Sequence, residues 1–249
     1  MKIKKIKFFF AIGYMAFAYC LITSFVYPGK RAKNLPPEVV IVKPSQNEQF
    51  SWNTIVRYNI SISDKEDGKS AYDEINAKEV LLEVCYLPDV ATAKKYIDKK
   101  KTGKEHNGLT MIRRSDCFTC HASKSKLIGP SFELIAKRYK LSSTSVERLS
   151  KNVLNGGTGL WGSAVMPAHK AIQSKDVKQM VTWILTNGAN PNLALYPGTE
   201  GAFKTIAKPI SRSTKTVMVL TASYTDHGDR DSMQNKKYGQ HSILLTCDN

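Results

Sequence analysis

The sequence predicts a multidomain α + β protein, in which a small all-α domain lies between two β segments and an apolar helix precedes them all. Three observations predict this fold class. Residues 8–27 are uncharged and mostly apolar, residues 36–90 and 191–249 contain runs rich in β-branched residues, and residues 109–190 place apolar residues at helical spacing. A chain of 249 residues that is 42% hydrophobic can bury the cores of several small domains.

The N-terminus has the composition of an export segment. A lysine-rich start is followed by the apolar run of residues 8–27, which is typical of a secretory signal peptide. An apolar run of about twenty residues can also cross a bilayer, so residues 1–27 are either a signal peptide or a membrane anchor. Cys20 is a poor lipoprotein site, because Tyr19 rather than a small residue precedes it. The rest of the chain is expected to be periplasmic or extracytoplasmic, and anchored to the inner membrane if residues 8–27 are retained.

The chain is strongly basic, with a formal net charge of +16 at pH 7. Such a charge usually indicates nucleic acid or an anionic membrane surface as the partner. Export would separate the protein from nucleic acid, which excludes that partner. Loss of the lysine-rich leader would still leave a basic protein, so we expect an acidic protein or an anionic membrane as its electrostatic partner.

Residues 36–90 are expected to form a β-sandwich-like domain, because "EVVIVKPS", "TIVRYNISIS" and "AKEVLLEVCYLP" have the composition of strands. Residues 191–249 add "TKTVMVLTASYTD" and "HSILLTCDN", which are too few strands to bury a core alone. We therefore expect the C-terminal strands to complete the sandwich of residues 36–90, with the helical domain inserted between them. A disulfide between Cys85 and Cys247 would support this in an oxidising compartment.

Two charged stretches lie before and after the last strand of the first β segment. The stretch "SDKEDGKSAYDEI" groups carboxylates that could bind calcium, but the spacing does not fit an EF-hand loop, and an acidic surface turn is preferred. Residues 91–108 are rich in lysine with little apolar periodicity, so they are expected to be a solvated helix or a linker between domains. The carboxylates are those of Asp64, Glu66, Asp67, Asp73 and Glu74.

Residues 109–190 are expected to form helices joined by short loops. "SFELIAKRYK" and "SKDVKQMVTWILTNG" each draw an apolar stripe along one helix face, and Ser174 is expected to cap the second of them. Between them, "TSVERLSKNVLNGG" begins with Thr144 and Glu147, whose spacing is that of a capping box.

The run "CFTCH" places Cys117, Cys120 and His121 in the C-x-x-C-H pattern that attaches c-type haem. In this chemistry each thiol adds to a vinyl group of the porphyrin and the histidine reaches the iron. A zinc site would need two more ligands, and Cys85 and Cys247 lie in distant β segments. A redox dithiol would follow a central strand, whereas the preceding "LTMIRR" has a helical pattern. One covalent haem c is therefore the expected cofactor.

The iron needs either an open position or a second protein ligand, and exported electron carriers commonly supply a methionine thioether. Met166 is the candidate, because it stands in "GGTGLWGSAVMPAHK", a glycine-rich loop that can reach the far face of the haem. His169 is the rival ligand. Met111 and Met180 lie in helical patterns and are expected in the core.

These residues together resemble a small class I bacterial cytochrome c over about residues 109–187. The resemblance implies that His121 and Met166 bind the iron from opposite sides. It also implies that Pro130 helps to orient the histidine and that Trp161 packs at a haem propionate. No catalytic residue follows from the resemblance, so an electron-transfer protein is expected rather than an enzyme.

The flanking β segments are similar to those that accompany cytochrome modules in exported quinoprotein sugar dehydrogenases. The expected fold is thus a cytochrome c domain flanked by, or inserted into, an Ig-like β-sandwich. The chain lacks the propeller domain of those enzymes, which leaves its electron donor open. The resemblance implies a dehydrogenase as donor and a terminal acceptor as the second redox partner.

Three functions are compatible with these residues. The first is an exported electron carrier, in which a haem with two protein ligands changes oxidation state with little rearrangement. The second is the electron-accepting cytochrome subunit of a sugar dehydrogenase or another respiratory complex. The third is a gas-sensing or catalytic haem from which Met166 can be displaced, although no acid–base constellation points to catalysis.

Overall fold

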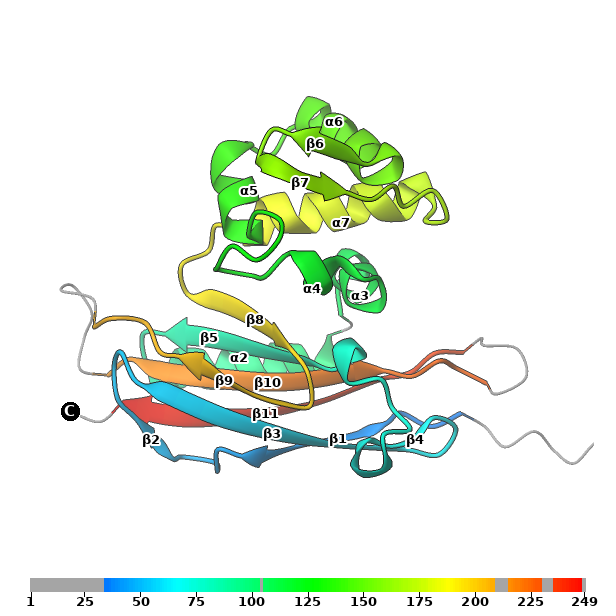
Figure 1. Cartoon of the computed structure of the whole chain (residues 1–249). Coiled ribbons are helices and arrows are strands. Elements are labelled where there is room, and N and C mark those ends of the chain that lie inside the picture. Colours follow the sequence, from blue (N-terminus) through cyan, green and yellow to red (C-terminus); the bar gives the residue numbers. More distant parts are fainter. Residues whose placement is uncertain (1–33, 104, 209–214, 230–234, 248–249) are drawn as a thin grey trace, which may run out of the picture. The chain divides into compact units, whose positions relative to one another are not determined.

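The computed structural model describes residues 34–103, 105–208, 215–229 and 235–247 (Figure 1). The predicted leader, residues 1–27 with Cys20, lies outside the described residues. Within the ranges that the structure describes, no helix is both long and apolar enough to cross a membrane.

The first β-sheet is built around β3 (Ile55–Asp64). Its N-terminal half pairs with β9 (Glu200–Lys204), and its C-terminal half pairs with β1 (Glu38–Lys43). At its end β3 also pairs with the short β4 (Gly68–Lys69), which precedes the 3-10 helices η1 (Ser70–Tyr72) and η2 (Ala77–Glu79). The first sheet therefore joins strands from both ends of the described chain.

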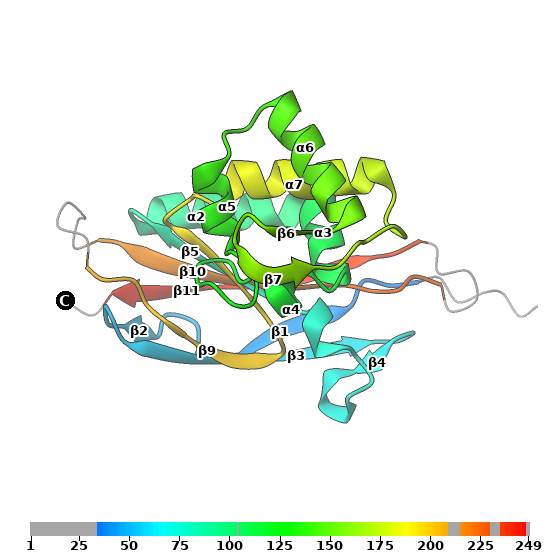
Figure 2. The same cartoon turned by 45° about the horizontal axis from the view of Figure 1, so that its top comes forward.

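The second sheet has the strand order β2-β11-β10-β5-β8 (Figure 2). All pairings are antiparallel except that of β2 with β11. The central strand, β10, is buried along its whole length, as expected for a strand covered on both faces. The members are β2 (Gln49–Phe50), β5 (Leu81–Leu87), β8 (Leu193–Pro197), β10 (Val217–Thr225) and β11 (Tyr238–Cys247).

The main apolar core lies between the two sheets. Met218 and Leu220 of β10 pack there with Ile60 and Ile62 of β3, and all four side chains are at most 2% exposed. Only every second residue of a strand can contribute to this core, because successive side chains point to opposite faces of a sheet.

The helical region is inserted between two neighbouring strands of the second sheet. β5 ends at Leu87, and the chain returns as β8, which pairs with β5 from Leu81↔Pro197 to Cys85↔Leu193. The other edge of β5 pairs with β10. The C-terminal strands therefore share a sheet with β5, and the helical region leaves and re-enters at one place in that sheet.

The expected disulfide between Cys85 and Cys247 is not present. Cys85 lies opposite Val219, which belongs to an apolar cluster on the outer face of the second sheet. Cys247 instead packs against the core between the two sheets. The two thiols are on opposite faces and on strands separated by β10, a placement that a disulfide cannot span.

Most of the lysine-rich residues 91–108 are helical, which is one of the two structures that the sequence predicts. They hold most of helix α2 (Val90–Thr102), whose first turn is capped by Asp89 through a hydrogen bond from Thr92 N at 2.7 Å. Ala93, Tyr96 and Ile97 pack on the outer face of the second sheet. The apolar periodicity of this face is weak in the sequence, because lysines occupy most of the other positions of the helix.

The inserted region contains five helices and one hairpin within the described residues. α3 and α7 approach each other closely at Gly108, where a Cβ atom would lie 2.2 Å from the carbonyl oxygen of Gln179. The elements are α3 (Asn107–Arg114), α4 (Cys117–Cys120), α5 (Phe132–Arg138), α6 (Ser143–Asn155), β6 (Gly157–Gly159), β7 (Gly162–Met166) and α7 (Ser174–Asn187).

Two helix caps differ from the capping residues expected. The N-cap of α6 is Ser142, two residues before Thr144, because Ser142 Oγ accepts the hydrogen bond of Ser145 N at 3.1 Å. Glu147 pairs with Lys178 of α7 at 2.7 Å. Ser174 lies inside α7, whose first turn has no side-chain cap at Gln173.

Candidate haem-binding site

Helix α4 presents the two cysteines of the attachment motif on one turn. Cys117 and Cys120 are three residues apart, so their side chains lie on neighbouring positions of one helix face. Burial, followed by the nearby charge of Asp116, raises the pKa of the Cys117 thiol to about 12. A redox-active dithiol needs a thiol with a lowered pKa. The raised pKa therefore speaks against the dithiol interpretation.

The His121 ring is held by the backbone of the loop that follows it. Nδ1 of His121 lies 2.7 Å from the carbonyl oxygen of Pro130. A carbonyl oxygen can only accept a hydrogen bond, so Nδ1 must carry a proton, and in a neutral ring Nε2 then keeps the lone pair. This is the tautomer that a metal-binding histidine with a backbone partner adopts.

Gly129 and Phe132 fix the plane of the same ring. A Cβ atom at position 129 would lie 2.5 Å from Cε1 of His121, so only glycine allows the loop to pass so close. The ring of Phe132 is stacked on that of His121, with centroids 6.0 Å apart and an interplanar angle of 13°. The sequence motif did not predict the role of Gly129, because the contact depends on how the loop folds back.

Met166 is the last residue of β7, which forms a hairpin with β6 rather than an open loop. Gly156, just before β6, has φ of +74°, and a Cβ atom there would lie 2.7 Å from the carbonyl oxygen of Met166. The hairpin thus requires glycine at this crossing. It gives the thioether a defined position, which the glycine-rich sequence alone did not predict.

His169, the rival ligand, lies beside the residue that precedes Cys117. Its Nδ1 is 3.5 Å from Oδ1 of Asp116, and its side chain is 17% exposed. Its backbone N–H donates to the carbonyl of Val153 at 3.0 Å.

Trp161 lies beside a cation that the motif analysis missed. The guanidinium carbon of Arg138 is 4.6 Å from the centre of the Trp161 ring, and Arg138 also donates to the carbonyl of Leu160 at 3.3 Å. A guanidinium in such a position could pair with a carboxylate such as a haem propionate. No sequence signal marked Arg138, since a basic residue at a helix end is usually solvated.

The segments between His121 and Met166 also expose apolar side chains. Each of the five below is at least 40% exposed, and apolar surface is what the face of a porphyrin requires. Together with the thiols, His121 and Met166, these residues fit a covalently bound haem. The side chains are Leu127, Ile128, Leu134, Leu160 and Val165.

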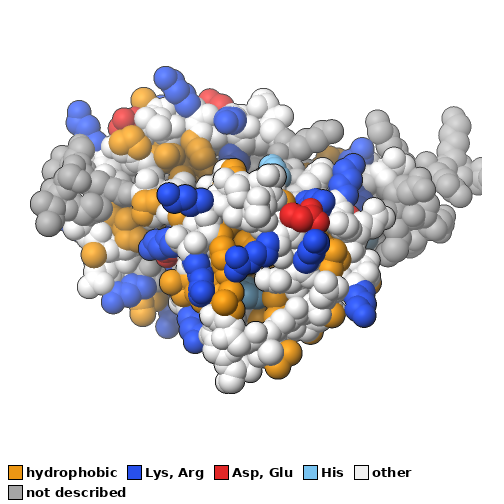
Figure 3. Space-filling model, turned by 90° about the horizontal axis from the view of Figure 1, so that it is seen from above, with side chains coloured by type: hydrophobic (Ala, Val, Ile, Leu, Met, Phe, Trp, Pro, Cys, Tyr) orange, Lys and Arg blue, Asp and Glu red, His pale blue; other side chains and the backbone are white. Residues whose placement is uncertain are grey.

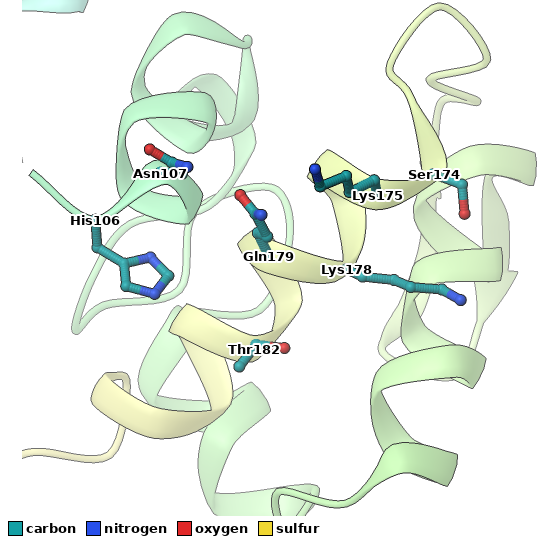
Figure 4. A pocket seen from close by; sticks show the side chains of 7 residues that line it. All are labelled: His106, Asn107, Ser174, Lys175, Lys178, Gln179 and Thr182. Atoms are coloured by element: carbon teal, nitrogen blue, oxygen red, sulfur yellow. The ribbon is translucent and has the colours of Figure 1, made fainter.

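A separate polar cleft of about 610 Å³ lies between α3 and α7 (Figure 4). His106 and Asn107 face Gln179 and Thr182 across it, while Lys178 points towards α6. None of the attachment or candidate ligand residues lines this cleft.

The acidic stretch of residues 64–74 uses its carboxylates within the protein. Oδ1 of Asp64 accepts from Glu66 N and Asp67 N at 2.9 and 2.8 Å, and Glu74 accepts from Lys69 N at 2.8 Å. Among the residues that the structure describes, no three histidine, cysteine or acidic side chains are grouped to hold a metal ion. Nothing in this geometry favours calcium.

The comparisons with known proteins agree on one region. At 34% identity over 77 residues, the chain matches cytochrome c-551 of Allochromatium vinosum, covering 31% of this chain and 82% of that protein. It is 33% identical over 76 residues to cytochrome c-552 of Hydrogenobacter thermophilus, covering 30% of this chain and 76% of that protein. The crystal structure of Nitrosomonas europaea cytochrome c552 matches with 28% identity and a TM-score of 0.30, covering 31% of this chain and 96% of that chain. No family model matches.

Proposed function

Because the chain belongs to the cytochrome c family, we propose that it is an exported one-electron carrier whose haem iron is held between His121 and Met166. Electron transfer and covalent haem attachment follow from the family itself. Cytochromes c are electron-transfer proteins rather than enzymes, and they carry covalently bound haem c. The chain is therefore a haem cytochrome that exchanges electrons with redox partners.

The observation that carries the ligand assignment is the contact between His121 and Pro130. The 2.7 Å hydrogen bond to the Pro130 carbonyl places a proton on Nδ1, so Nε2 is the nitrogen of the neutral ring that can donate to iron. Cys117 and Cys120 would hold the porphyrin through thioether bonds, and Met166 would complete the coordination. When bound, the haem supplies an iron centre that accepts and releases single electrons.

The chain's own residues would prepare the site for this chemistry. Gly129 and Phe132 fix the orientation of the His121 ring, so little reorientation is needed when the iron changes charge. Trp161 and Arg138 provide a cation and a ring surface for a propionate. The β6–β7 hairpin restricts Met166. A closed coordination sphere suits electron transfer and disfavours ligand exchange.

Export is the second part of the proposal, and it rests on residues 1–27, whose lysine-rich start and apolar run resemble a secretory signal. We place the protein in an extracytoplasmic compartment. Figure 3 shows the face over the helices, where Lys and Arg side chains lie among apolar patches and acidic side chains are few. A redox partner with acidic side chains around its docking site would be attracted to this face.

A second candidate is the electron-accepting subunit of a larger dehydrogenase. The observation that favours it is the size of the β region, since less than a third of this chain matches at least three quarters of each of the two relatives named above. The chain also builds two sheets from strands that lie before and after the helical region. Such a domain could hold the cytochrome against a catalytic subunit. Co-purification of a stoichiometric dehydrogenase from the native host would favour this candidate.

The test uses the full chain produced in a host with a haem-attachment system. We expect one covalent haem per chain, a reversible one-electron titration and a reduced spectrum that carbon monoxide does not alter at neutral pH. A carbon monoxide complex would instead indicate an open or displaceable sixth position and a sensing or catalytic haem. Absence of covalent haem would contradict the proposal.

A further inference from the structure

Helix α2, which precedes the haem-attachment motif in the chain, presents a lysine-rich face. Its inner side is fixed to the second sheet, where Ala93 is fully buried and Tyr96 and Ile97 pack on Val217 and Val219 (Figure 1). The helix is thus held as a rigid element, and its opposite side faces solvent.

The inner charges of α2 are neutralised within the protein. Glu83 of β5 is buried, accepts a hydrogen bond from the Tyr96 hydroxyl and pairs with Lys100 Nζ at 2.7 Å. The charge of Lys100, the one lysine of α2 that lies against the sheet, is therefore paired within the protein. The remaining lysines of the helix have a different environment.

Four lysines lie on the solvent side of α2, and Asp98 is the only acidic residue there. None of the four makes an ion pair with any residue that the structure describes. Lys95 and Lys99 are four residues apart, where like charges repel along a helix. The face thus carries a net positive charge, four lysines against Asp98, on a fixed backbone. The lysines are Lys94, Lys95, Lys99 and Lys101.

We infer that this lysine face of α2 binds the surface of an anionic lipid bilayer. Lysine is depleted in protein–protein interfaces, whose energetic centres are formed by Trp, Tyr and Arg. The solvent side of α2 has none of these residues. A row of compact, hydrated ammonium groups suits a surface that is recognised by charge density rather than by shape, and this is how polybasic segments bind anionic membranes.

Binding of the lysine face of α2 to a bilayer would also position the haem domain relative to the membrane. Only four residues separate Thr102, the end of α2, from Asn107, the start of α3. Arg113 of α3 is buried and donates to the carbonyl of Ser223 in β10 at 3.2 Å. A bilayer that binds α2 would therefore hold the haem domain through a connection that is short in sequence. This inference does not depend on which residues ligate the iron.

The test compares binding of the full-length holoprotein to neutral and anionic vesicles by co-sedimentation. One set is pure phosphatidylcholine, and in the other about a third of the lipid is phosphatidylglycerol. The ratio of the two affinities removes any contribution of the apolar residues 8–27, since these do not distinguish the lipids by charge. The α2 variant is Lys94→Gln, Lys95→Gln, Lys99→Gln and Lys101→Gln combined.

A matched control removes the same charge from the helical domain, where four other exposed lysines are replaced by glutamine. Each lysine near an anionic bilayer strengthens binding about fivefold, so the α2 variant, which lacks four lysines, should lose up to about 600-fold of its preference for anionic vesicles. The control variant should lose less than about threefold. The control lysines are Lys126, Lys140, Lys151 and Lys175.

Lysine acetylation in the wild-type protein gives a readout that does not depend on a variant. Anionic vesicles should protect Lys94 and Lys95 from acetylation and leave Lys140 unprotected. The inference would be overturned if both variants lost the same preference for anionic vesicles, or if Lys94 and Lys95 were not protected from acetylation. Either result would show that binding depends only on the net charge of the protein. If the α2 variant keeps its preference for anionic vesicles but loses binding to polyglutamate, the face recognises an acidic polypeptide instead.

Discussion

Nη2 of Arg113 lies 2.9 Å from Oε2 of Glu105, and the two side chains are only 0% and 6% exposed. The same guanidinium group also donates to Thr225 Oγ1 at 2.6 Å and to the Ser223 carbonyl. The hydrogen bonds of Arg113 therefore join helix α3 of the haem domain to strand β10 of the sheet, and the buried ion pair with Glu105 neutralises the guanidinium at this junction. Leu81 of β5 extends this junction, because it packs in one cluster with residues of the helical domain.

Removal of the Arg113 side chain should strongly destabilise the protein. Arg113→Ala leaves the carboxylate of Glu105 buried without its cation, and breaking such a pair costs about 3–5 kcal/mol of unfolding free energy. Urea unfolding of the holoprotein, followed by haem absorbance and by far-UV circular dichroism, measures the loss. The exposed pair of Lys137 with Glu133 is the control, and Lys137→Gln should cost less than about 0.5 kcal/mol. Equal costs for both variants would contradict a structural role of the buried pair.

The pH dependence of stability should contain a contribution from His241. Burial lowers its pKa below the ordinary value of 6.5, and its Nδ1 accepts a hydrogen bond from Ile41 N at 3.0 Å. The unfolded chain therefore takes up a proton at a higher pH than the folded chain. The stabilisation is fully present above about pH 6.5 and is lost as the pH falls through the lower pKa of the folded state.

The variant His241→Asn isolates this contribution, because asparagine can accept the same hydrogen bond but does not titrate. Unfolding free energies are measured at about pH 8 and about pH 5 for both proteins. The wild type should lose more stability on acidification than the variant. Identical losses would assign the pH dependence to other groups.

The sequence predicted the haem motif because its parts are local. Cys117, Cys120 and His121 are adjacent in the chain, and the chemistry depends on that spacing alone. Gly129 and Arg138 were missed because their importance arises from contacts across a loop and between a helix and a hairpin. Residue type at these two positions carries no comparable signal.

The β region shows a different limit of sequence reasoning. Strand composition indicated where β5, β10 and β11 run, but not which residues face the core. Register decides that Cys85 faces outward and Cys247 inward, and a shift of one residue would exchange the faces of a strand. The wrong disulfide follows from this missing information. Similarly, the successive hydroxyl residues from Ser142 to Ser145 could each cap α6, and only the structure selects Ser142.

The attachment cysteines should be required for covalent haem, and the other cysteines should not. The double variant Cys117→Ala and Cys120→Ala removes both groups that can form thioethers. We expect no haem to remain with the denatured polypeptide, as measured by intact mass and by haem staining of a denaturing gel. Cys247→Ala, in a strand of the β region, is the control and should retain haem at the wild-type level. Covalent haem in the double variant would refute the assigned attachment site.

The identity of the second iron ligand is tested by Met166→Leu. Leucine has a similar volume but no thioether, so the haem should remain attached while the weak long-wavelength band of iron–methionine bonding disappears and the reduction potential falls. Met180 provides a matched control, because it is buried in α7 and packs in the core of the helical domain. Met180→Leu should keep both the band and the potential.

The variant His169→Asn tests the rival ligand. The His169 ring lies 3.5 Å from Asp116, and its removal should leave the haem spectrum unchanged. If Met166→Leu keeps the band, or His169→Asn alters the potential by as much as Met166→Leu, Met166 is not the ligand, and the β6–β7 hairpin serves only to pack the loop.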